Sequence, residues 1–549
     1  MPQPFSILSP RPSSDIKSDA KRMFVLGLVI FAGFAAVSVQ MLRLAMKDRR
    51  QPSIARLDAT ANHFSRPDIV DRRGRLLATD VGLPTLIADP SAIHRVDEVI
   101  ERLSPIFPGL DNEQTRKALA NSRSKYALLR RSVSPAIAER IHAMGLPGIH
   151  FQYESRRGYP AGRVAGHVLG AVNGSNHGTL GIERFLNDDP GISRVHGARV
   201  NAATPLRLSI DMSAQFAVEQ ELTTALKLYK AEAASAIILD ADTGEIVTAA
   251  SVPGVDPSET SELLDRKRRN RFADNVYELG SVFKPLTIAM ALETGVATAG
   301  SKIDVSGPLK FGRFTIRDPE RRVKRLSLTH VLVYSSNVAS GILAGVTGAK
   351  RQKAFLSKLG LTDAVDPPDV KTAPPKLPDF WGRAATATIG YGHGISVSPL
   401  QFAVASASLV NGGYRVRPTF LAVAREKAVN RTKRVLKQST SDLIRRMLRE
   451  NVRVGTGKLA AVKGYDVGGK TGTADLARQG KYDGKSVITS FLAAFPMHAP
   501  RYIVFSTLYD PMPGQNKKHR SAAKNAAPLT GEIIKRVAPL LGVQPRPKG

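Results

Sequence analysis

A serine and a lysine three residues apart could supply a nucleophile and the base that activates it. Ser281 and Lys284 lie in residues 277–285, directly before an apolar stretch of helical character at 286–293. Positions i and i+3 share one face of a helix. A serine hydroxyl becomes a good nucleophile when a neighbouring base takes its proton, and a lysine half-buried beside a second cation has a pKa low enough to be that base. The helix N-terminus would favour the negative charge that develops.

This spacing is not specific by itself. The chain contains Ser-x-x-Lys four more times, at Ser14, Ser18, Ser122 and Ser521. What distinguishes Ser281 is the sequence that follows it. Ser335-Ser336-Asn337 supplies a second hydroxyl and an amide two residues apart, although alone it is more typical of a helix cap.

The third group is the most specific. Residues 467–474 read as a strand that carries Lys470, the hydroxyls of Thr471 and Thr473, and Gly472, which lets a ligand approach the backbone. A phosphate-binding loop is the alternative, because two glycines five residues apart precede the lysine. Strand-like residues surround the lysine, however, rather than a loop that could cradle phosphates.

In this order, Ser-x-x-Lys, Ser-x-Asn and Lys-Thr-Gly resemble the motifs of penicillin-binding proteins and serine β-lactamases. Residues 70–77 look like the opening motif of the class B pedestal domain. No segment resembles the glycosyltransferase domain of class A relatives, and the length and motifs look most like the division-specific branch of Gram-negative bacteria. One departure is Leu279, where the family usually has proline. Further matches are 157–160, Gly178, Gly181, Glu183, 243–246, 269–271, 390–394 and 398–401.

The resemblance implies a peptidoglycan D,D-transpeptidase, which needs no metal or cofactor. It makes Ser281 the nucleophile on the penultimate D-Ala carbonyl of a stem pentapeptide and Lys284 its general base. Ser335 would relay the proton to the leaving D-Ala, and Asn337 would bind the donor amide. The backbone N–H groups of Ser281 and Thr473 would form the oxyanion hole. The substrate-binding group would be Lys470, Thr471, Gly472 and Thr473, whose lysine and hydroxyls hold the terminal carboxylate.

Local patterns indicate the elements that position these residues. The pattern predicts a strand at 206–210 and a helix capped by Asp211. Two further strand-like runs, 236–239 and 245–249, are joined by 240–244, which has the composition of a hairpin turn. With the resemblance, we expect an α/β (α+β) transpeptidase fold, in which helices flank an antiparallel sheet, preceded by a mixed pedestal domain and one transmembrane helix.

Near the N-terminus, residues 23–39 form an uncharged apolar run that continues toward Leu44. At about 17 to 24 residues it can span a bilayer, although a cleaved signal peptide or a buried helix would also be apolar. Basic residues bracket both ends, so the charges do not set its orientation. The resemblance places the N-terminus in the cytoplasm and both domains in the periplasm, anchored in the inner membrane. The expected domains are a disordered tail 1–22, the transmembrane helix 23–46, a dimerisation-type pedestal 47–203, the transpeptidase domain 204–541 and a disordered tail 542–549.

Composition limits the function classes. At 549 residues the chain is too long for one core. With 79 Lys and Arg against 47 Asp and Glu, the net charge of +32 raises the question of nucleic acid or an anionic surface as a partner. A periplasmic location excludes the chromosome and leaves anionic lipids and wall polymers. The absence of cysteine excludes disulfides, thiolate zinc sites and thiol nucleophiles.

Three alternatives stay open at this point: an elongation-specific class B transpeptidase, a hydrolase such as a D,D-carboxypeptidase or β-lactamase, and a catalytically silent penicilloyl sensor or division scaffold. The partners that the resemblance implies are stem pentapeptides, lipid-linked glycan strands and β-lactams. It also implies a membrane glycan polymerase of the shape, elongation, division and sporulation (SEDS) family and small bitopic division proteins.

Overall fold

The computed structural model describes residues 24, 28, 30–41, 66–188, 204–312, 314–318, 323–365, 367, 369–429, 433–478, 481–513 and 520–546. The chain divides into two compact units, Met1–His63 and Phe64–Gly549. In the first unit the described residues are helical. The rest of the predicted transmembrane helix 23–46 and the whole predicted tail 1–22 lie outside the described residues. None of the helices in the described ranges is both long and apolar enough to cross a membrane.

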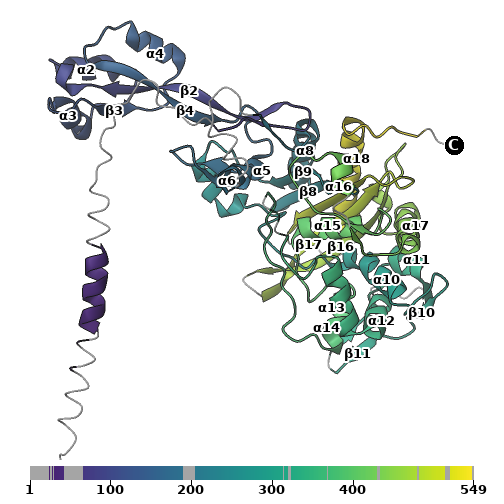
Figure 1. Cartoon of the computed structure of the whole chain (residues 1–549). Coiled ribbons are helices and arrows are strands. Elements are labelled where there is room, and N and C mark those ends of the chain that lie inside the picture. The colour runs from purple at the N-terminus through teal and green to yellow at the C-terminus, as the bar shows by residue number, and fades with distance from the viewer. Residues whose placement is uncertain are drawn as a thin grey trace, which may run out of the picture. The chain divides into compact units, whose positions relative to one another are not determined.

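The second unit begins with a pedestal sheet (Figure 1). Its strands run in the order β3-β2-β1-β7, and β4 pairs with β2 over ten residues. The helices α2, α3 and α4 pack on a separate small hydrophobic cluster around Leu86 and Leu103. The elements of this region are β1 (Ile69–Val70), β2 (Leu76–Ala88), α2 (Val96–Leu103), α3 (Glu113–Ala120), β3 (Ala127–Arg130), α4 (Pro135–His142), β4 (Ile149–Gly158), α5 (Gly166–Leu169), β5 (Ala171–Val172), β6 (Gly178–Leu180), α6 (Gly181–Asp188) and β7 (Leu206–Arg207).

Arg157 and Glu183, which lie in two of the matching segments of the pedestal, form a buried ion network with Arg66 and Asp80. Arg157 Nε donates to Glu183 Oε1 at 2.7 Å, and Arg157 Nη1 donates to Asp80 Oδ1 at 3.1 Å. Arg66 Nε donates to the other oxygen of Glu183 at 2.9 Å. Because each buried charge faces one of opposite sign, the network ties β2, β4 and α6 together without leaving a charge uncompensated.

The opening motif connects the pedestal to the transpeptidase domain. The fully buried Asp71 accepts hydrogen bonds from Arg75 Nη2 at 2.6 Å and from the backbone of Met212 at 3.1 Å. Met212 is the first residue of α8 (Met212–Leu228), whose predicted cap is confirmed because Asp211 accepts from two N–H groups of the first turn. The predicted strand at 206–210 is shorter and differently placed: β7 pairs in parallel with β1 and so belongs to the pedestal sheet.

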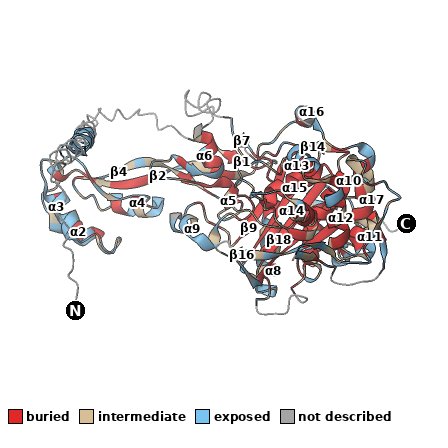
Figure 2. Cartoon of the chain, turned by 90° about the horizontal axis from the view of Figure 1, so that it is seen from below, coloured by how far each residue is buried: buried red, intermediate tan, exposed pale blue. Residues whose placement is uncertain are grey.

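The predicted antiparallel sheet is confirmed. It has five strands in the order β16-β17-β18-β8-β9. The two strands predicted at 236–239 and 245–249 pair with each other in this sheet, and the strand predicted around Lys470 is its edge strand. Its strands are β8 (Ala233–Asp240), β9 (Ile246–Val252), β16 (Gly468–Arg478), β17 (Lys481–Phe495) and β18 (Tyr502–Tyr509). Figure 2 shows that burial is concentrated in this sheet and its helices.

Helices cover both faces of the sheet. One face packs on α8 and α18 (Ala526–Leu540) around Phe495 and Val504. The other face packs on the larger group that includes α10 and α15. The remaining helices are α9 (Thr260–Leu264), α10 (Lys284–Glu293), α11 (Leu328–Val333), α12 (Asn337–Thr347), α13 (Ala349–Lys358), α14 (Arg383–Ile389), α15 (Pro399–Ala407), α16 (Arg425–Val429) and α17 (Gln438–Val454), and a short 3₁₀ helix, η3 (Gly280–Phe283), precedes α10. Short strand pairs join β10 (Lys302–Asp304) to β13 (Arg325–Ser327), β11 (Leu309–Phe311) to β12 (Phe314–Ile316), and β14 (Tyr414–Arg415) to β15 (Lys433–Arg434).

The C-terminal tail needs a correction. Residues 542–549 were expected to be disordered, but Val543 is buried in the cluster under α18 and Arg546 N donates to Gly464 O at 2.8 Å. The apolar side chain of Val543 holds the chain against the domain despite the neighbouring prolines. Residues 547–549 lie outside the described ranges.

Candidate active site

The predicted nucleophile lies on a turn that rests directly on the edge strand β16. Gly280, which precedes Ser281, has a φ of +63°, in the left-handed region that favours glycine. A Cβ on Gly280 would lie 2.5 Å from Thr473 O, and one on Gly472 would collide with Leu279 O. The two glycines therefore allow close approach of the turn and the strand. Leu279, the departure from the family pattern, is fully buried beneath the turn.

Lys284 begins α10 and is fully buried. Its Nζ donates to Asn337 Oδ1 at 2.8 Å, to Ser335 Oγ at 3.0 Å and to the Ser335 carbonyl. Ser281 is partly exposed, and its Oγ has no hydrogen-bond partner among the described residues. The hydroxyl of Ser281 is thus free to react, while the Ser-x-Asn motif fixes the position of the lysine.

Lys470, on β16, also contacts Ser335. Its Nζ donates to Ser335 Oγ at 3.0 Å and to the oxygens of Thr471 at 3.0 and 3.1 Å. Ser335 Oγ therefore accepts from two buried lysines, and its backbone has a φ of +57°, which is strained for a residue with a side chain. The fold thereby joins five predicted site residues, namely Lys284, Ser335, Asn337, Lys470 and Thr471, in one hydrogen-bonded group.

Burial changes the protonation of both lysines. It lowers the pKa of Lys284 well below its ordinary value, and repulsion from Lys470 lowers it further, against a smaller opposing effect of Asp318. Burial lowers the pKa of Lys470 to about 7. A neutral lysine amine has a lone pair that can accept a proton. An amine whose pKa is lowered in this way is able to act as a general base.

Asp318 positions the Ser-x-Asn motif and is not part of any pattern found in the sequence. Its carboxylate accepts from Ser336 Oγ at 2.6 Å and from the backbone N–H of Asn337 at 2.6 Å. Ser336 in turn caps α12 through Ala339 N at 3.0 Å. The carboxylate comes from the loop after β12, so only the tertiary structure reveals this helix cap.

The remaining residues predicted to bind substrate lie farther along β16. This strand is at the edge of the sheet, so part of its backbone N–H groups face away from β17. Thr473 Oγ1 accepts a hydrogen bond from Ala522 N at 3.1 Å. Thr471 is buried, whereas Thr473 is exposed. The two hydroxyls of the Lys-Thr-Gly-Thr segment therefore lie in different surroundings.

A cluster of one carboxylate and three aromatic rings, formed by Glu278, Tyr391, His393 and Tyr482, lies beside the turn that carries Ser281. Two of its members, Tyr391 and His393, were recognised from the sequence only as part of the matching segment 390–394. The carboxylate of Glu278 accepts from Gly394 N and approaches His393 Nδ1, each at 2.7 Å. The His393 ring lies 6.5 Å from that of Tyr391 and 6.0 Å from that of Tyr482. The hydrogen bond with Glu278 raises the pKa of His393. This group ties the turn before Ser281 to the loop after α14.

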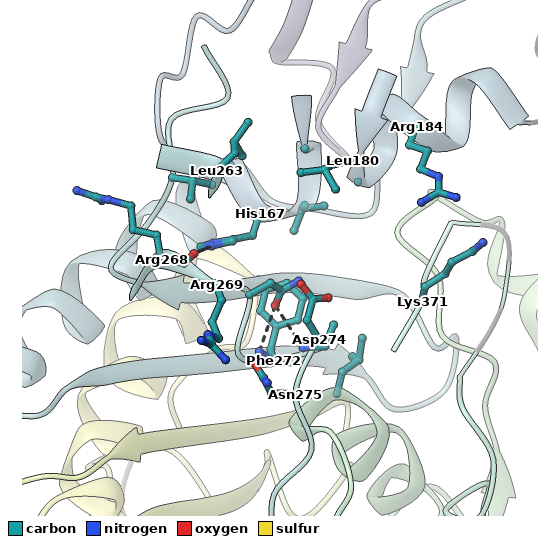
Figure 3. Close-up of a pocket in the computed structure, with 18 of the residues that line it drawn as sticks. His167, Leu180, Arg184, Leu263, Arg268, Arg269, Phe272, Asp274, Asn275 and Lys371 are labelled. Atoms are coloured by element: carbon teal, nitrogen blue, oxygen red, sulfur yellow. Dashed lines mark hydrogen bonds between the residues drawn. The ribbon is translucent and has the colours of Figure 1, made fainter. Parts of the chain in front are cut away.

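A separate cavity of about 620 Å³ lies between pedestal and transpeptidase elements. Figure 3 shows His167 and Arg184 on the pedestal side and Arg269, Asn275 and Lys371 on the other. None of the eight predicted site residues lines it. Within the described ranges, no group of three or more His, Asp or Glu side chains could hold a metal ion.

Comparisons with known proteins identify both domains. The profile of the penicillin-binding protein transpeptidase domain matches residues 234–535, and that of the penicillin-binding protein dimerisation domain matches residues 63–188. The chain is 35% identical to the probable peptidoglycan D,D-transpeptidase FtsI of Caulobacter vibrioides, over 87% of this chain and 82% of that protein. It is 32% identical to the peptidoglycan D,D-transpeptidase FtsI of Escherichia coli (88% and 84%). Its identity to the probable peptidoglycan D,D-transpeptidase PenA of Neisseria meningitidis is 28% (88% and 86%).

Proposed function

The chain belongs to the class B penicillin-binding proteins as a peptidoglycan D,D-transpeptidase of the FtsI and PenA type, and we propose that Ser281 is its acylated nucleophile. The observation that carries this proposal is the pair of buried lysines on Ser335, one of which starts the helix that directly follows Ser281. Among the Ser-x-x-Lys sequences in the described residues, Ser281-Val-Phe-Lys284 is the one whose lysine bonds to the Ser-x-Asn motif, and Ser335 Oγ of that motif also accepts from Lys470.

These contacts support the following acylation step. Neutral Lys284 keeps two N–H donors, which Ser335 and Asn337 accept, and turns its lone pair to the Ser281 hydroxyl. As the proton leaves, Ser281 Oγ attacks the penultimate D-Ala carbonyl of a stem peptide and the oxygen becomes an oxyanion. The backbone N–H groups of Ser281 and Thr473 stabilise that oxyanion, and a single such donor contributes about 10²–10³ in rate.

Collapse of the tetrahedral intermediate breaks the peptide bond. Ser335 relays a proton to the departing D-Ala amine, while the segment Lys470-Thr471-Gly472-Thr473 binds its carboxylate. The amine of a neighbouring stem then attacks the acyl-enzyme, forms the cross-link and releases Ser281. β-Lactams, which resemble the D-Ala-D-Ala end, acylate the same serine and stay attached.

Labelling with a fluorescent penicillin tests the nucleophile. We expect label on the peptide that contains Ser281, located by mass spectrometry, and no label on a Ser281→Ala variant that unfolds at the same temperature as the intact protein. Ser122→Ala, which removes another Ser-x-x-Lys serine, is the matched control and should label normally. A folded intact protein that takes no label would instead support a silent sensor or scaffold.

The finer assignments belong to the same proposal. We place the pedestal at 47–203 and the transpeptidase domain at 204–541, both in the periplasm and anchored in the inner membrane by residues 23–46. The uncharged run at 23–39 supports the anchor. The similarity to FtsI supports a role in septal synthesis beside a SEDS-family glycan polymerase and small division proteins. Recovery of neither partner from membranes in mild detergent would contradict this assignment.

A further inference from the structure

A chain of hydrogen bonds with one direction leaves the active site through Lys470 and ends outside the three motifs. Lys470 Nζ donates to Thr471 Oγ1 at 3.1 Å, and Thr471 Oγ1 donates to Thr456 Oγ1 at 2.9 Å. Thr456 Oγ1 donates to Asn451 Oδ1 at 3.3 Å. A hydroxyl has one hydrogen to donate. The hydrogen of Thr471 is therefore committed to Thr456, and its oxygen faces the lysine as an acceptor.

Asn451 is the last acceptor in this series of hydrogen bonds. It lies in the last turn of α17 and is fully buried. Its Nδ2 donates to Gly469 O of β16 at 2.8 Å, and its own carbonyl accepts from Gly455 N at 2.9 Å and Gly457 N at 3.3 Å. Both polar ends of the side chain and the backbone carbonyl are thus used to fix the loop that carries Thr456 against β16.

The neighbours of Thr456 show that the loop is built for close approach. A Cβ on Gly455 would collide with Asn451 Oδ1, the acceptor of the Thr456 hydroxyl. A Cβ on Gly457 would lie 3.1 Å from Asn451 Nδ2 and 3.3 Å from the ring of Phe491. Side chains at either position would push the loop away from Asn451. The Gly-Thr-Gly sequence therefore places one hydroxyl, that of Thr456, beside Thr471.

The hydroxyl of Thr473, also on β16, has a different pattern of hydrogen bonds from that of Thr471. Thr473 Oγ1 accepts from Ala522 N at 3.1 Å, and its own hydrogen has no acceptor among the described residues. The Thr473 oxygen already accepts one hydrogen bond and its hydrogen is available to a ligand, whereas the hydrogen of Thr471 is used and its oxygen accepts from Lys470. The two threonines of the motif are therefore prepared for different tasks.

We propose that Thr456 is a positioning residue for the transpeptidase reaction: it takes the hydroxyl hydrogen of Thr471, keeps that oxygen as an acceptor for Lys470, and leaves Thr473 as the hydroxyl donor to the substrate carboxylate. This inference rests on the proposed function of the site. Without the Thr456 oxygen, the Thr471 hydroxyl turns to other acceptors and Lys470 loses a partner that stabilises its charged form.

Loss of the Thr456 hydroxyl should shift the pH dependence of the acylation rate in one direction. A hydrogen bond to the charged form favours that form, so loss of the acceptor lowers the pKa of Lys470 further. Carboxylate binding needs the ammonium. The alkaline limb of the acylation rate therefore moves to lower pH when Thr456 is replaced by an isosteric residue without a hydroxyl.

The test measures the second-order rate constant for acylation by a fluorescent penicillin across pH. Thr456→Val should lower it about 3- to 10-fold near neutral pH, the range expected for loss of one neutral hydrogen bond, and should move the alkaline limb down. Thr456→Ser should restore both. Thr223→Val removes an exposed hydroxyl on α8 and serves as the control. An unchanged limb in Thr456→Val, with or without a lower melting temperature, would leave Thr456 only a structural role and overturn the proposal.

A double-mutant comparison isolates the route through Thr471. If Thr456 acts through Thr471, Thr456→Val should change the rate less than twofold when Thr471 is already valine. Additive losses would overturn the proposal. Failure of the proposed function has a different signature, because the unmodified protein would then not be labelled at Ser281 at all.

Discussion

The pedestal and the active site both bury charge, but in opposite ways. In the pedestal, Arg157 and Glu183 have fully buried side chains and face each other at 2.7 Å. In the active site, Lys284 and Lys470 are as deeply buried, and neither has a carboxylate within salt-bridge distance among the described residues. They share the neutral oxygen of Ser335 instead.

The free-energy cost of burying a charge has a different consequence in each region. Burial penalises a charged group unless an opposite charge compensates it. In the pedestal compensation keeps the charges and joins three elements. In the active site the absence of compensation lowers both lysine pKa values and so makes an amine available as a base.

The largest expected effect comes from removing the base. Lys284→Met should lower the penicillin acylation rate by about 10³-fold or more, since general base catalysis contributes about 10²–10⁴. It should not lower the melting temperature, because folding has to bury and deprotonate this amine, a cost that the methionine side chain does not have. If Lys284→Met lost as much thermal stability as the pedestal variant Glu183→Gln, the contrast between the two regions would be wrong.

The second effect is on stability. Glu183→Gln leaves Arg66 and Arg157 without their shared carboxylate, and removing one partner of a buried ion pair costs about 3–5 kcal/mol. Native-state hydrogen exchange in β2 and β4 measures this local loss. Protein that remains folded should acylate at close to the unmodified rate. Unchanged exchange would show that the network is not needed for the pedestal sheet.

The third effect is a pH dependence. The folded pKa of Lys470 is about 7, below the ordinary value of 10.5, so the unfolded chain binds more protons between these values. Lys470 therefore destabilises the fold at and below about pH 7, and the penalty disappears as pH rises toward 10.5. Lys470→Met carries no such penalty, so its melting temperature should exceed that of the unmodified protein at pH 7, and the gap should narrow by roughly 2–4 °C at pH 9.5. An equal gap at both pH values would contradict the lowered pKa.

The smallest effect comes from an exposed pair in the pedestal. Glu113 and Lys117 lie 2.7 Å apart on α3 with most of both side chains in water. Glu113→Gln should change the free energy of unfolding by less than about 0.5 kcal/mol, since water screens such pairs. It is the matched control for Glu183→Gln. Similar losses in the two variants would mean that burial does not distinguish these ion pairs.

Much of the fold was predictable where local patterns are strong. The cap at Asp211, the helix after Lys284 and the strand around Lys470 appear where the sequence predicts them. The strand predicted at 206–210 is shorter in the structure, and its pairing with the pedestal strand β1 was not predictable, because the alternation within a strand does not indicate its partner. The tail at 542–549 was misjudged because prolines suggested disorder while Val543 had an apolar site to fill.

For the site, the sequence by itself determined which side chains are present to act as nucleophile, base and carboxylate ligands in the proposed reaction, and in which order they occur, because each of these roles requires particular side chains. Only the tertiary structure decided how they meet. Ser335 lies 51 residues from Lys284 and 135 from Lys470 along the chain, yet its Oγ accepts from both. Asp318, Thr456 and Asn451 have no local pattern that marks them, because their roles arise from contacts between distant segments. The lowered pKa values likewise follow from burial, which is a property of the packed domain and not of any one segment.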